Sequence, residues 1–212
     1  MTQGFFIVFE GGDGSGKSTQ LGMLADRLRA FGRDVVRTRE PGGTLMGRQI
    51  RQLLLHSEEV GPKAEALLFA ADRAHHVDSL VRPALARGAV VLSDRFMDSS
   101  IAYQGQGRDL GVEEVRELSL WATTRLLPDI TVILDLDPNI AAKRLGDHLD
   151  RMESAGITFH TQVRQRFLDM AAEGGDSYLV VDASKPAEVI AQEIWQHVWP
   201  RVNNGTKDDL DG

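Results

Sequence analysis

Short apolar runs alternate with longer amphipathic stretches along this 212-residue chain. The first helical stretch, from Thr19 to Arg29, places three leucines on one face, which is the spacing of an amphipathic helix. The last such stretch runs from Ala187 to Val198. The apolar runs are the candidate strands, and they are Phe5–Phe9, Asp34–Thr38, Ala89–Ser93, Ile130–Asp135 and Tyr178–Asp182. Strands that alternate with helices predict an α/β fold, with a five-stranded parallel sheet covered by helices on both faces.

Polar residues follow four of these candidate strands at the point where each strand ends. They are Glu10 to Ser18, Arg39 to Pro41, Asp94 with Arg95, and Asp135 to Asp137. Ligands of parallel sheets bind at the carboxyl ends of the strands. We therefore expect these polar residues to gather on one rim of the sheet.

The stretch from Gly11 to Ser18 matches the phosphate-loop pattern G-x-x-x-x-G-K-[ST] between a candidate strand and a candidate helix. Its glycines let backbone N–H groups converge on phosphates, and the helix start adds a positive dipole end. Lys17 is expected to reach the β- and γ-phosphates, while the Ser18 hydroxyl holds Mg²⁺. The predicted fold is thus that of a P-loop NTPase, and the expected ATP contacts are Gly11, Gly12, Asp13, Gly14, Ser15, Gly16, Lys17, Ser18 and Thr19.

Composition narrows the class of protein. The 24 basic and 31 acidic residues give a formal charge of −7, which argues against a nucleic-acid binder. There is no cysteine, which favours a reducing cytoplasm and excludes thiol catalysis. We see no signal-peptide pattern and no apolar run long enough to cross a membrane. One domain is expected over residues 1–202, and the polar segment 203–212 is expected to be a disordered tail.

A phosphate loop alone leaves two classes open, namely a phosphoryl-transferring kinase and a regulatory GTPase whose loops switch on hydrolysis. A guanine-reading GTPase carries Asn/Thr-Lys-x-Asp after a late strand. This chain contains Thr206-Lys207-Asp208-Asp209, but no strand is predicted before it, so we interpret it as coincidence. The kinase class is favoured, and other nucleoside or nucleotide kinases remain the alternative within it.

Further segments narrow the kinase class through a resemblance. They are Glu10-Gly11-Gly12-Asp13, Arg39-Glu40-Pro41-Gly42-Gly43-Thr44, Asp94-Arg95-Phe96, Ser99-Ser100-Ile101-Ala102-Tyr103-Gln104-Gly105 and Leu149-Asp150-Arg151-Met152-Glu153. In this order they resemble the bacterial thymidylate kinases, from about Phe5 to Trp195. The resemblance implies Mg²⁺-dependent phosphorylation of dTMP to dTDP by ATP, in a homodimer with a five-stranded parallel core.

The resemblance also implies roles for individual residues at the acceptor site. Arg95 is expected on the acceptor phosphate, Asp13 on the sugar 3′-hydroxyl, and Asp94 near the magnesium through water. Tyr103 is expected to block the space of a ribose 2′-hydroxyl. The full expected dTMP set is Asp13, Arg39, Phe69, Arg73, Arg95, Ser100, Tyr103 and Gln104.

The residue types alone leave blander interpretations of these positions open. Arg39 and Arg95 could be surface arginines, and Asp13 could be a turn former before glycine. Asp94 could merely orient Arg95. Without the resemblance, Phe69 is typical of a core aromatic on an apolar helix stripe. Arg73 lies four residues on, beside apolar residues, and such a cation fits a core poorly, which favours the functional interpretation.

The segment 143–166 is the predicted helical lid, and its five basic residues are Lys143, Arg144, Arg151, Arg164 and Arg166. A solvated helix face is the alternative interpretation of such a run. Bacterial relatives usually have more arginines just before the Asp-Arg-x-Glu match, where this chain has Gly146 and Asp147. We expect Arg151 to supply the transition-state cation and Arg144 to stack on adenine or act second. The expected catalytic set is Lys17, Arg95, Arg151 and Arg144.

Overall fold

A five-stranded, all-parallel sheet forms the centre of the computed structural model, which describes residues 4–56, 60–146 and 152–204. The strands are β1 (Phe5–Glu10), β2 (Val35–Arg39), β3 (Val90–Asp94), β4 (Ile130–Asp135) and β5 (Tyr178–Asp182), in the spatial order β2-β3-β1-β4-β5. The predicted sheet is confirmed. Its register aligns the strand ends, because Asp94 pairs with Phe9 and with Arg39, and Asp135 pairs with Asp182.

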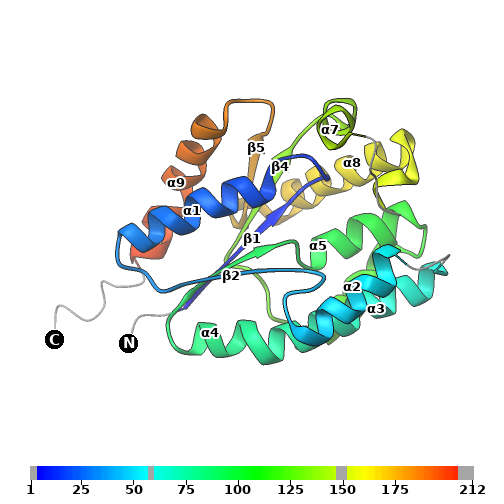
Figure 1. The fold of residues 1–212 in the computed structure, drawn as a ribbon, viewed down its shortest axis with the longest axis horizontal. Helices are drawn as coiled ribbons and strands as arrows, with labels where there is room; N and C mark the ends of the chain where they lie inside the picture. Colours follow the sequence, from blue (N-terminus) through cyan, green and yellow to red (C-terminus); the bar gives the residue numbers. More distant parts are fainter. Residues whose placement is uncertain (1–3, 57–59, 147–151, 205–212) are drawn as a thin grey trace.

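Helices cover both faces of the sheet (Figure 1). One face is covered by α1 (Lys17–Ala30) and α9 (Ala187–Asn204). The elements on the other side are α2 (Leu45–His56), α3 (Pro62–His76), the π-helical η1 (Val77–Val81), α4 (Arg82–Ala86), α5 (Met97–Ser100), the π-helical η2 (Ile101–Gly107), α6 (Val112–Ala122) and α8 (Ile157–Gly174). The remaining elements follow β4 along the chain. Helix α7 (Pro138–Leu145) comes directly after it, the short turn η3 (Glu153–Ala155) precedes α8, and the short turn η4 (Gly175–Ser177) precedes β5.

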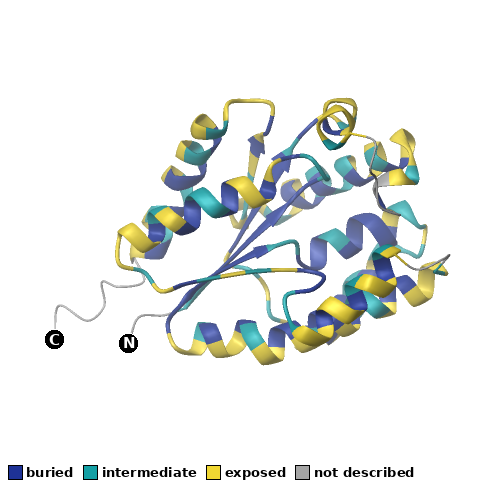
Figure 2. Ribbon diagram, in the orientation of Figure 1, coloured by how far each residue is buried: buried dark blue, intermediate teal, exposed yellow. Residues whose placement is uncertain are grey.

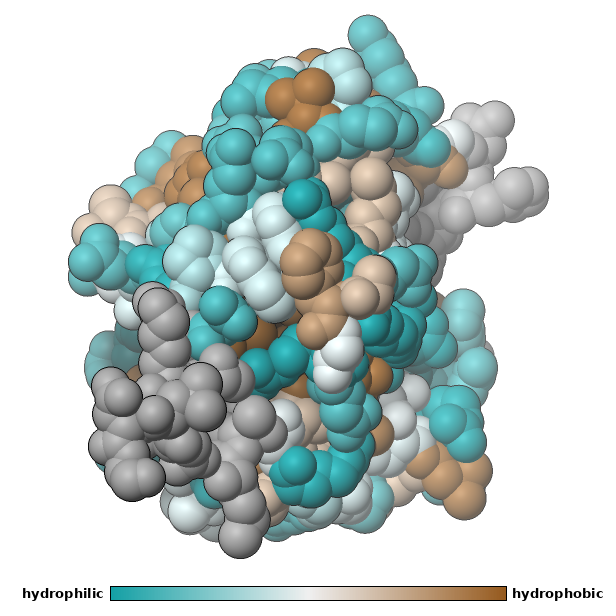
Figure 3. Space-filling view, turned by 90° about the vertical axis from the view of Figure 1, so that its left-hand side faces the viewer, coloured by the Kyte–Doolittle hydropathy of each residue, from teal (hydrophilic) through white to brown (hydrophobic). Residues whose placement is uncertain are grey.

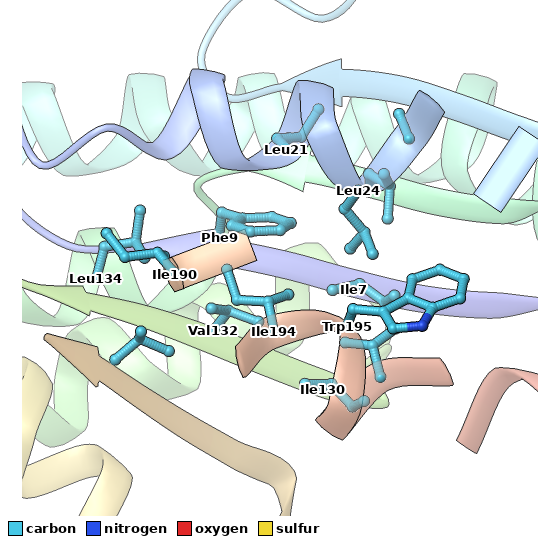
Figure 4. Packing of buried hydrophobic residues seen from close by; sticks show 14 of the residues in the cluster. Ile7, Phe9, Leu21, Leu24, Ile130, Val132, Leu134, Ile190, Ile194 and Trp195 are labelled. Carbon is cyan, nitrogen blue, oxygen red and sulfur yellow. The ribbon is translucent and has the colours of Figure 1, made fainter. Parts of the chain in front are cut away.

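Two apolar cores hold the layers together, one on each side of the sheet. The first joins the inward face of β1 and β4 to leucines of α1 and to Ile190, Ile194 and Trp195 of α9 (Figure 4). The central strands β3, β1 and β4 are buried almost throughout, whereas the edge strands β2 and β5 are partly exposed (Figure 2). At roughly 1.5–3 kcal/mol for each fully buried large aliphatic side chain, this burial fixes which face of α1 meets the sheet, and hence where the phosphate loop ends.

The side of the molecule at the amino ends of the strands, which faces the viewer in Figure 3, lies away from the rim (Figures 1 and 3). Its surface is mainly hydrophilic, with apolar side chains scattered in small groups (Figure 3). Helix α9 continues to Asn204, two residues into the segment predicted as a tail, and 205–212 lie outside the described residues. None of the described helices is long and apolar enough to cross a membrane.

Candidate active site

The phosphate loop joins the end of β1 to the start of α1, as predicted. Three of its glycines have backbone angles that other residues rarely adopt, with φ of 128° at Gly11, 75° at Gly14 and 93° at Gly16. A Cβ atom at Gly11 would lie 2.5 Å from the Leu134 carbonyl oxygen, and one at Gly14 would lie 2.9 Å from that of Ala141. Glycine therefore lets the loop pack closely against β4 and α7.

Lys17 opens α1 and folds its side chain back over the phosphate loop. Its Nζ donates to the carbonyl oxygens of Gly11 at 3.1 Å and Gly12 at 2.7 Å. Burial, and then the neighbouring Arg95 cation, lower the pKa of Lys17. The ammonium group is thus fixed at the mouth of the loop, where a phosphate would compete for its hydrogen bonds.

Arg95 lies across the loop from Lys17, directly after β3. Its Nη2 donates to Asp13 Oδ1 at 2.6 Å, and its Nη1 donates to the Gly11 carbonyl at 3.1 Å and to Ser99 Oγ at 2.9 Å. Its guanidinium carbon lies 5.2 Å from the centre of the Tyr103 ring. The cation therefore sits at the junction of β1, β3 and η2, with its planar fork fixed by several partners.

Two adjoining cavities meet at Asp13 and Arg95, and both are lined by these two residues. The first contains six of the eight predicted acceptor residues, which are Asp13, Phe69, Arg95, Ser100, Tyr103 and Gln104. The second contains Gly14, Gly16, Lys17, Ser18, Thr19, Arg39, Asp94 and Arg144. The other predicted loop contacts, Gly11, Gly12 and Ser15, do not line it. Residues from distant parts of the sequence are thus brought together along one rim.

Phe69 of α3 lines the first cavity with a half-buried ring and belongs to neither core cluster. This arrangement fits a stacking surface better than a core position. Gln104 is buried beside it, and its amide donates to Glu65 Oε1 at 2.8 Å. Tyr103 closes another wall, with its hydroxyl 3.4 Å from Asp13 Oδ2.

Arg73 is the predicted acceptor residue whose position differs most from the expected one. It is 1% exposed and does not line the cavity that contains Phe69. Its Nε donates to Glu40 Oε2 at 2.8 Å, and its Nη2 donates to the Phe96 carbonyl at 2.9 Å and to Ser100 Oγ at 3.1 Å. Partners on all three guanidinium nitrogens offset the cost of burying this charge. Arg73 therefore reaches the cavity only through Ser100, which lines it.

The predicted lid is described only in part, and Arg151 lies outside the described residues. Arg144 of α7 bridges the phosphate loop and the loop after β5, because it donates to the carbonyls of Gly14 at 3.3 Å and Ala183 at 3.2 Å. Arg164 of α8 forms a two-pronged ion pair with Asp135, at 2.6 and 2.9 Å. Helix α8 is thereby fastened to the end of β4.

Sequence reasoning missed three residues of this rim. Arg51 of α2 lines both cavities and donates to the Pro41 carbonyl at 3.2 Å. A basic residue on an amphipathic helix is typical of the solvent-exposed face, so the sequence pattern gave no reason to assign Arg51 to the site. Ser99 and Glu10 belonged to the quoted motifs but received no role, since their contacts span 89 residues of sequence.

A divalent metal site is compatible with the oxygen donors at the start of α1. Ser18 Oγ donates to Asp94 Oδ2 at 2.8 Å, so a hydroxyl and a carboxylate lie together beside the phosphate cavity. Among residues 4–56, 60–146 and 152–204 there is no cluster of three or more His, Cys, Asp or Glu that could hold a metal. This donor set suits an ion that keeps several waters and takes the rest of its ligands from nucleotide phosphates.

Comparison with known proteins identifies the same family that the sequence motifs resemble. The family model described as "Thymidylate kinase" matches residues 9–194. The thymidylate kinase of Leifsonia xyli subsp. xyli is 58% identical, over 90% of this chain and 92% of its own length. That of Bifidobacterium longum subsp. infantis is 50% identical, over 98% of this chain and 89% of its own. The crystal structure of thymidylate kinase from Ehrlichia chaffeensis aligns with a TM-score of 0.77 at 33% identity, covering 92% of this chain and 98% of that one.

Proposed function

Because this chain belongs to the thymidylate kinase family, which transfers phosphate from ATP to dTMP and forms dTDP, we propose how its residues divide the reaction. The phosphate loop and Arg144 bind ATP, and the cavity around Phe69 and Arg95 binds dTMP. One observation carries this division: Asp13 and Arg95 line both cavities. Two phosphate groups bound on either side of these residues would face each other, as transfer requires.

On the donor side, the backbone N–H groups of Gly11 to Thr19 cradle the phosphates, and Lys17 neutralises the β- and γ-oxygens. Arg144 holds the adenine side, which its contacts to Gly14 and Ala183 support. The family uses a divalent metal, and we propose Mg²⁺, held by Ser18 directly and by Asp94 through water. When bound, this ion neutralises charge on the phosphate oxygens.

On the acceptor side, Phe69 stacks on thymine, and Ser100 and Gln104 recognise the edge of the base. Arg73 contributes to this recognition through its hydrogen bond to Ser100. Asp13 accepts a hydrogen bond from the sugar 3′-hydroxyl, and Tyr103 fills the space beside the 2′ carbon of the sugar. Arg95 binds the acceptor phosphate with its planar fork, with Arg39 and Arg51 on the same rim. Each role is supported by the position of the side chain on one of the two cavities, or next to it.

Transfer is direct and in line, because the acceptor is already a phosphate anion and requires no strong general base. Catalysis consists of holding two anions together and neutralising the charge that spreads over the moving phosphoryl group. Lys17 and Arg95 supply part of this charge. We propose that Arg151 supplies the rest from the lid, residues 143–166, with Arg144 as the second candidate.

We also propose a homodimer that uses the outer surface of α2, α3 and α6. Helix α3 packs against both of the others, and Leu53, Leu67 and Trp121 on these helices are 50%, 59% and 81% exposed. Large apolar side chains exposed on neighbouring helices are typical of protein interfaces. The nucleotide substrates support a cytoplasmic location for the single domain formed by residues 1–202.

An ADP-release assay with ATP and a panel of nucleoside monophosphates tests the assignment. We expect dTMP to be the best acceptor and dUMP to be poorer by about tenfold, since one methyl group is worth roughly 1–3 kcal/mol. Arg95→Ala should raise the KM for dTMP far more than the KM for ATP. If no monophosphate stimulates ADP release, the kinase assignment fails.

A further inference from the structure

Glu10 is the last residue of β1 and is completely buried beneath the rim. Its Oε1 accepts from the backbone N–H groups of Phe96 at 2.8 Å and Ser99 at 3.1 Å. Its Oε2 accepts from the Ser99 hydroxyl at 2.6 Å. One carboxylate therefore collects three donors from the segment that follows β3. A buried carboxylate is costly unless it is paired in this way, so its presence needs an explanation.

The segment it holds contains a strained residue. The φ of Arg95 is 73°, in the left-handed region that is strained for a non-glycine residue. Such a conformation persists only where the surroundings fix it. The Arg95 N–H donates to the Phe9 carbonyl at 2.9 Å, and its carbonyl accepts from Ser93 Oγ at 2.8 Å. Glu10 fixes the next peptide through the Phe96 N–H, so the strained residue is held on both sides.

Glu10 also controls the direction of the Arg95 side chain. A serine hydroxyl has one proton and two lone pairs. Because the Ser99 proton is given to Glu10, the lone pairs remain for Arg95, whose Nη1 donates to Ser99 Oγ at 2.9 Å. This contact turns the other terminal nitrogen, Nη2, toward Asp13 at 2.6 Å. The order Glu10, Ser99, Arg95 is therefore a directed chain of hydrogen bonds that ends at the junction of the two cavities.

We propose that Glu10 is a positioning residue for acceptor binding, which acts on the dTMP phosphate by orienting Arg95 through Ser99. The proposal rests on the role proposed above for Arg95. Glu10 lines neither of the two cavities, so it touches neither substrate, and its effect passes to Arg95 through Ser99 and the Phe96 peptide. The donor site has its own contacts through Lys17 and Arg144, and it should be affected much less.

The charge on Glu10 adds a pH dependence to this role. Burial, together with the nearby Asp98 carboxylate, raises the pKa of Glu10 to about 7, although Arg95 and the hydrogen bonds from Ser99 and Phe96 oppose the rise. The other groups that face Glu10 are Lys17 of α1, Tyr103 of η2 and Tyr178 of β5. The hydroxyl of Tyr178 donates to Asp98 Oδ2 at 2.7 Å. As pH falls through about 7, Glu10 gains a proton, Ser99 loses its charged acceptor, and the hold on Arg95 weakens.

Steady-state kinetics on Glu10→Gln test the proposal. Glutamine keeps an oxygen for the Phe96 N–H but presents an amide to Ser99 in place of the charged acceptor. We expect the KM for dTMP to rise about tenfold, the scale of a hydrogen bond to a charged group, with the KM for ATP changed less than about twofold. Equal changes in both KM values, or none, overturn the proposal.

Two further variants separate positioning from general damage. Ser99→Ala should raise the KM for dTMP in the same direction without removing a buried charge, and it decides the question if Glu10→Gln does not fold. Asp129→Asn is the control for loss of a backbone-bound carboxylate, because Asp129 accepts from the N–H of Phe6, at the other end of β1, at 2.7 Å. Asp129→Asn should leave the KM for dTMP unchanged, and a rise equal to that of Glu10→Gln would show a merely structural role.

The pH profile provides the final readout. The phosphate of dTMP titrates at about pH 6 and affects every variant alike. The wild-type KM for dTMP should show an additional rise as pH falls through about 7, and Glu10→Gln should lack it; identical profiles count against the proposal. Arg95→Ala distinguishes failure of the role proposed for Arg95 from failure of the role proposed for Glu10. If it leaves the KM for dTMP unchanged, the role of Arg95 fails; if it raises this KM while Glu10→Gln does not, only the role of Glu10 fails.

Discussion

Asp13 shows how single residues tune one another at this rim. Burial alone would raise the pKa of the Asp13 carboxyl. Arg95 and Lys17 outweigh this effect and hold that pKa well below its usual range. Asp13 therefore stays ionised throughout the neutral range and orients Arg95 at 2.6 Å, while Lys17 Nζ lies 4.0 Å away. A negative charge inside a phosphate loop is tolerated because two cations flank it.

Lys17→Met tests the donor side of this arrangement. Methionine has a similar length and no charge, so the fold should persist while the cation next to the transferring phosphoryl is lost. We expect kcat to fall by at least about 100-fold, the cost of removing one preorganised electrostatic contact. Circular dichroism checks the fold and ADP release checks turnover, and unchanged turnover would refute the phosphate role.

Tyr103→Ala tests how the acceptor sugar is selected. The Tyr103 ring is 5% exposed and packs edge-on against Phe159 at 5.9 Å between centroids, so it cannot easily move aside. If it fills the 2′ side, its removal should improve ribothymidine monophosphate relative to dTMP. The ratio of the two kcat/KM values is the measurement, and an unmoved ratio means that another residue excludes ribose.

At the scale of elements, the phosphate sites depend on how α7 and α8 are fastened to the sheet. Arg164 pairs with Asp135 at the end of β4, while Arg144 reaches the phosphate loop and the loop after β5. The Arg164 side chain is 37% exposed, so its ion pair contributes no more than about 1 kcal/mol to stability. These contacts orient the two helices at the ends of the lid more than they stabilise the domain.

Two lid variants should separate binding from chemistry. Arg144→Ala should mainly raise the KM for ATP, since its contacts lie at the donor loops. Arg151→Ala should lower kcat strongly with little change in the KM for dTMP, the pattern of a contact made in the transition state. Steady-state kinetics on both variants decide the assignment, and a near-normal kcat for Arg151→Ala would move the search to the arginines of α8.

At the scale of the whole molecule, the sheet and the rim were predictable because they follow from local patterns. Each of the five apolar runs became a strand within about one residue of its predicted bounds, as expected where burial and β propensity agree. The contacts of Arg73 and Glu10 were not predictable. They depend on which loops meet across the rim, and the sequence pattern carries no information on such distant pairings.

The proposed dimer is tested by Trp121→Glu. A charge in place of this 81% exposed indole should be costly in an interface and nearly neutral on a free surface. We expect the variant to elute as a monomer in size-exclusion chromatography with light scattering. Val189→Glu is the control, because Val189 is 49% exposed on α9, which covers the other face of the sheet, and this change should leave the dimer intact.

The pairing of α1 with α9 has a consequence for the nascent chain on the ribosome. Gln20 of α1 donates to the Ala187 carbonyl at the start of α9, 167 residues later in the sequence. At about 5–20 residues per second, synthesis of that interval takes roughly 8–30 s. During this time the leucines of α1 have no α9 to cover them. The helix that begins at Lys17 is thus translated early and buried late, which makes its apolar face a natural target for the chaperones that meet emerging chains.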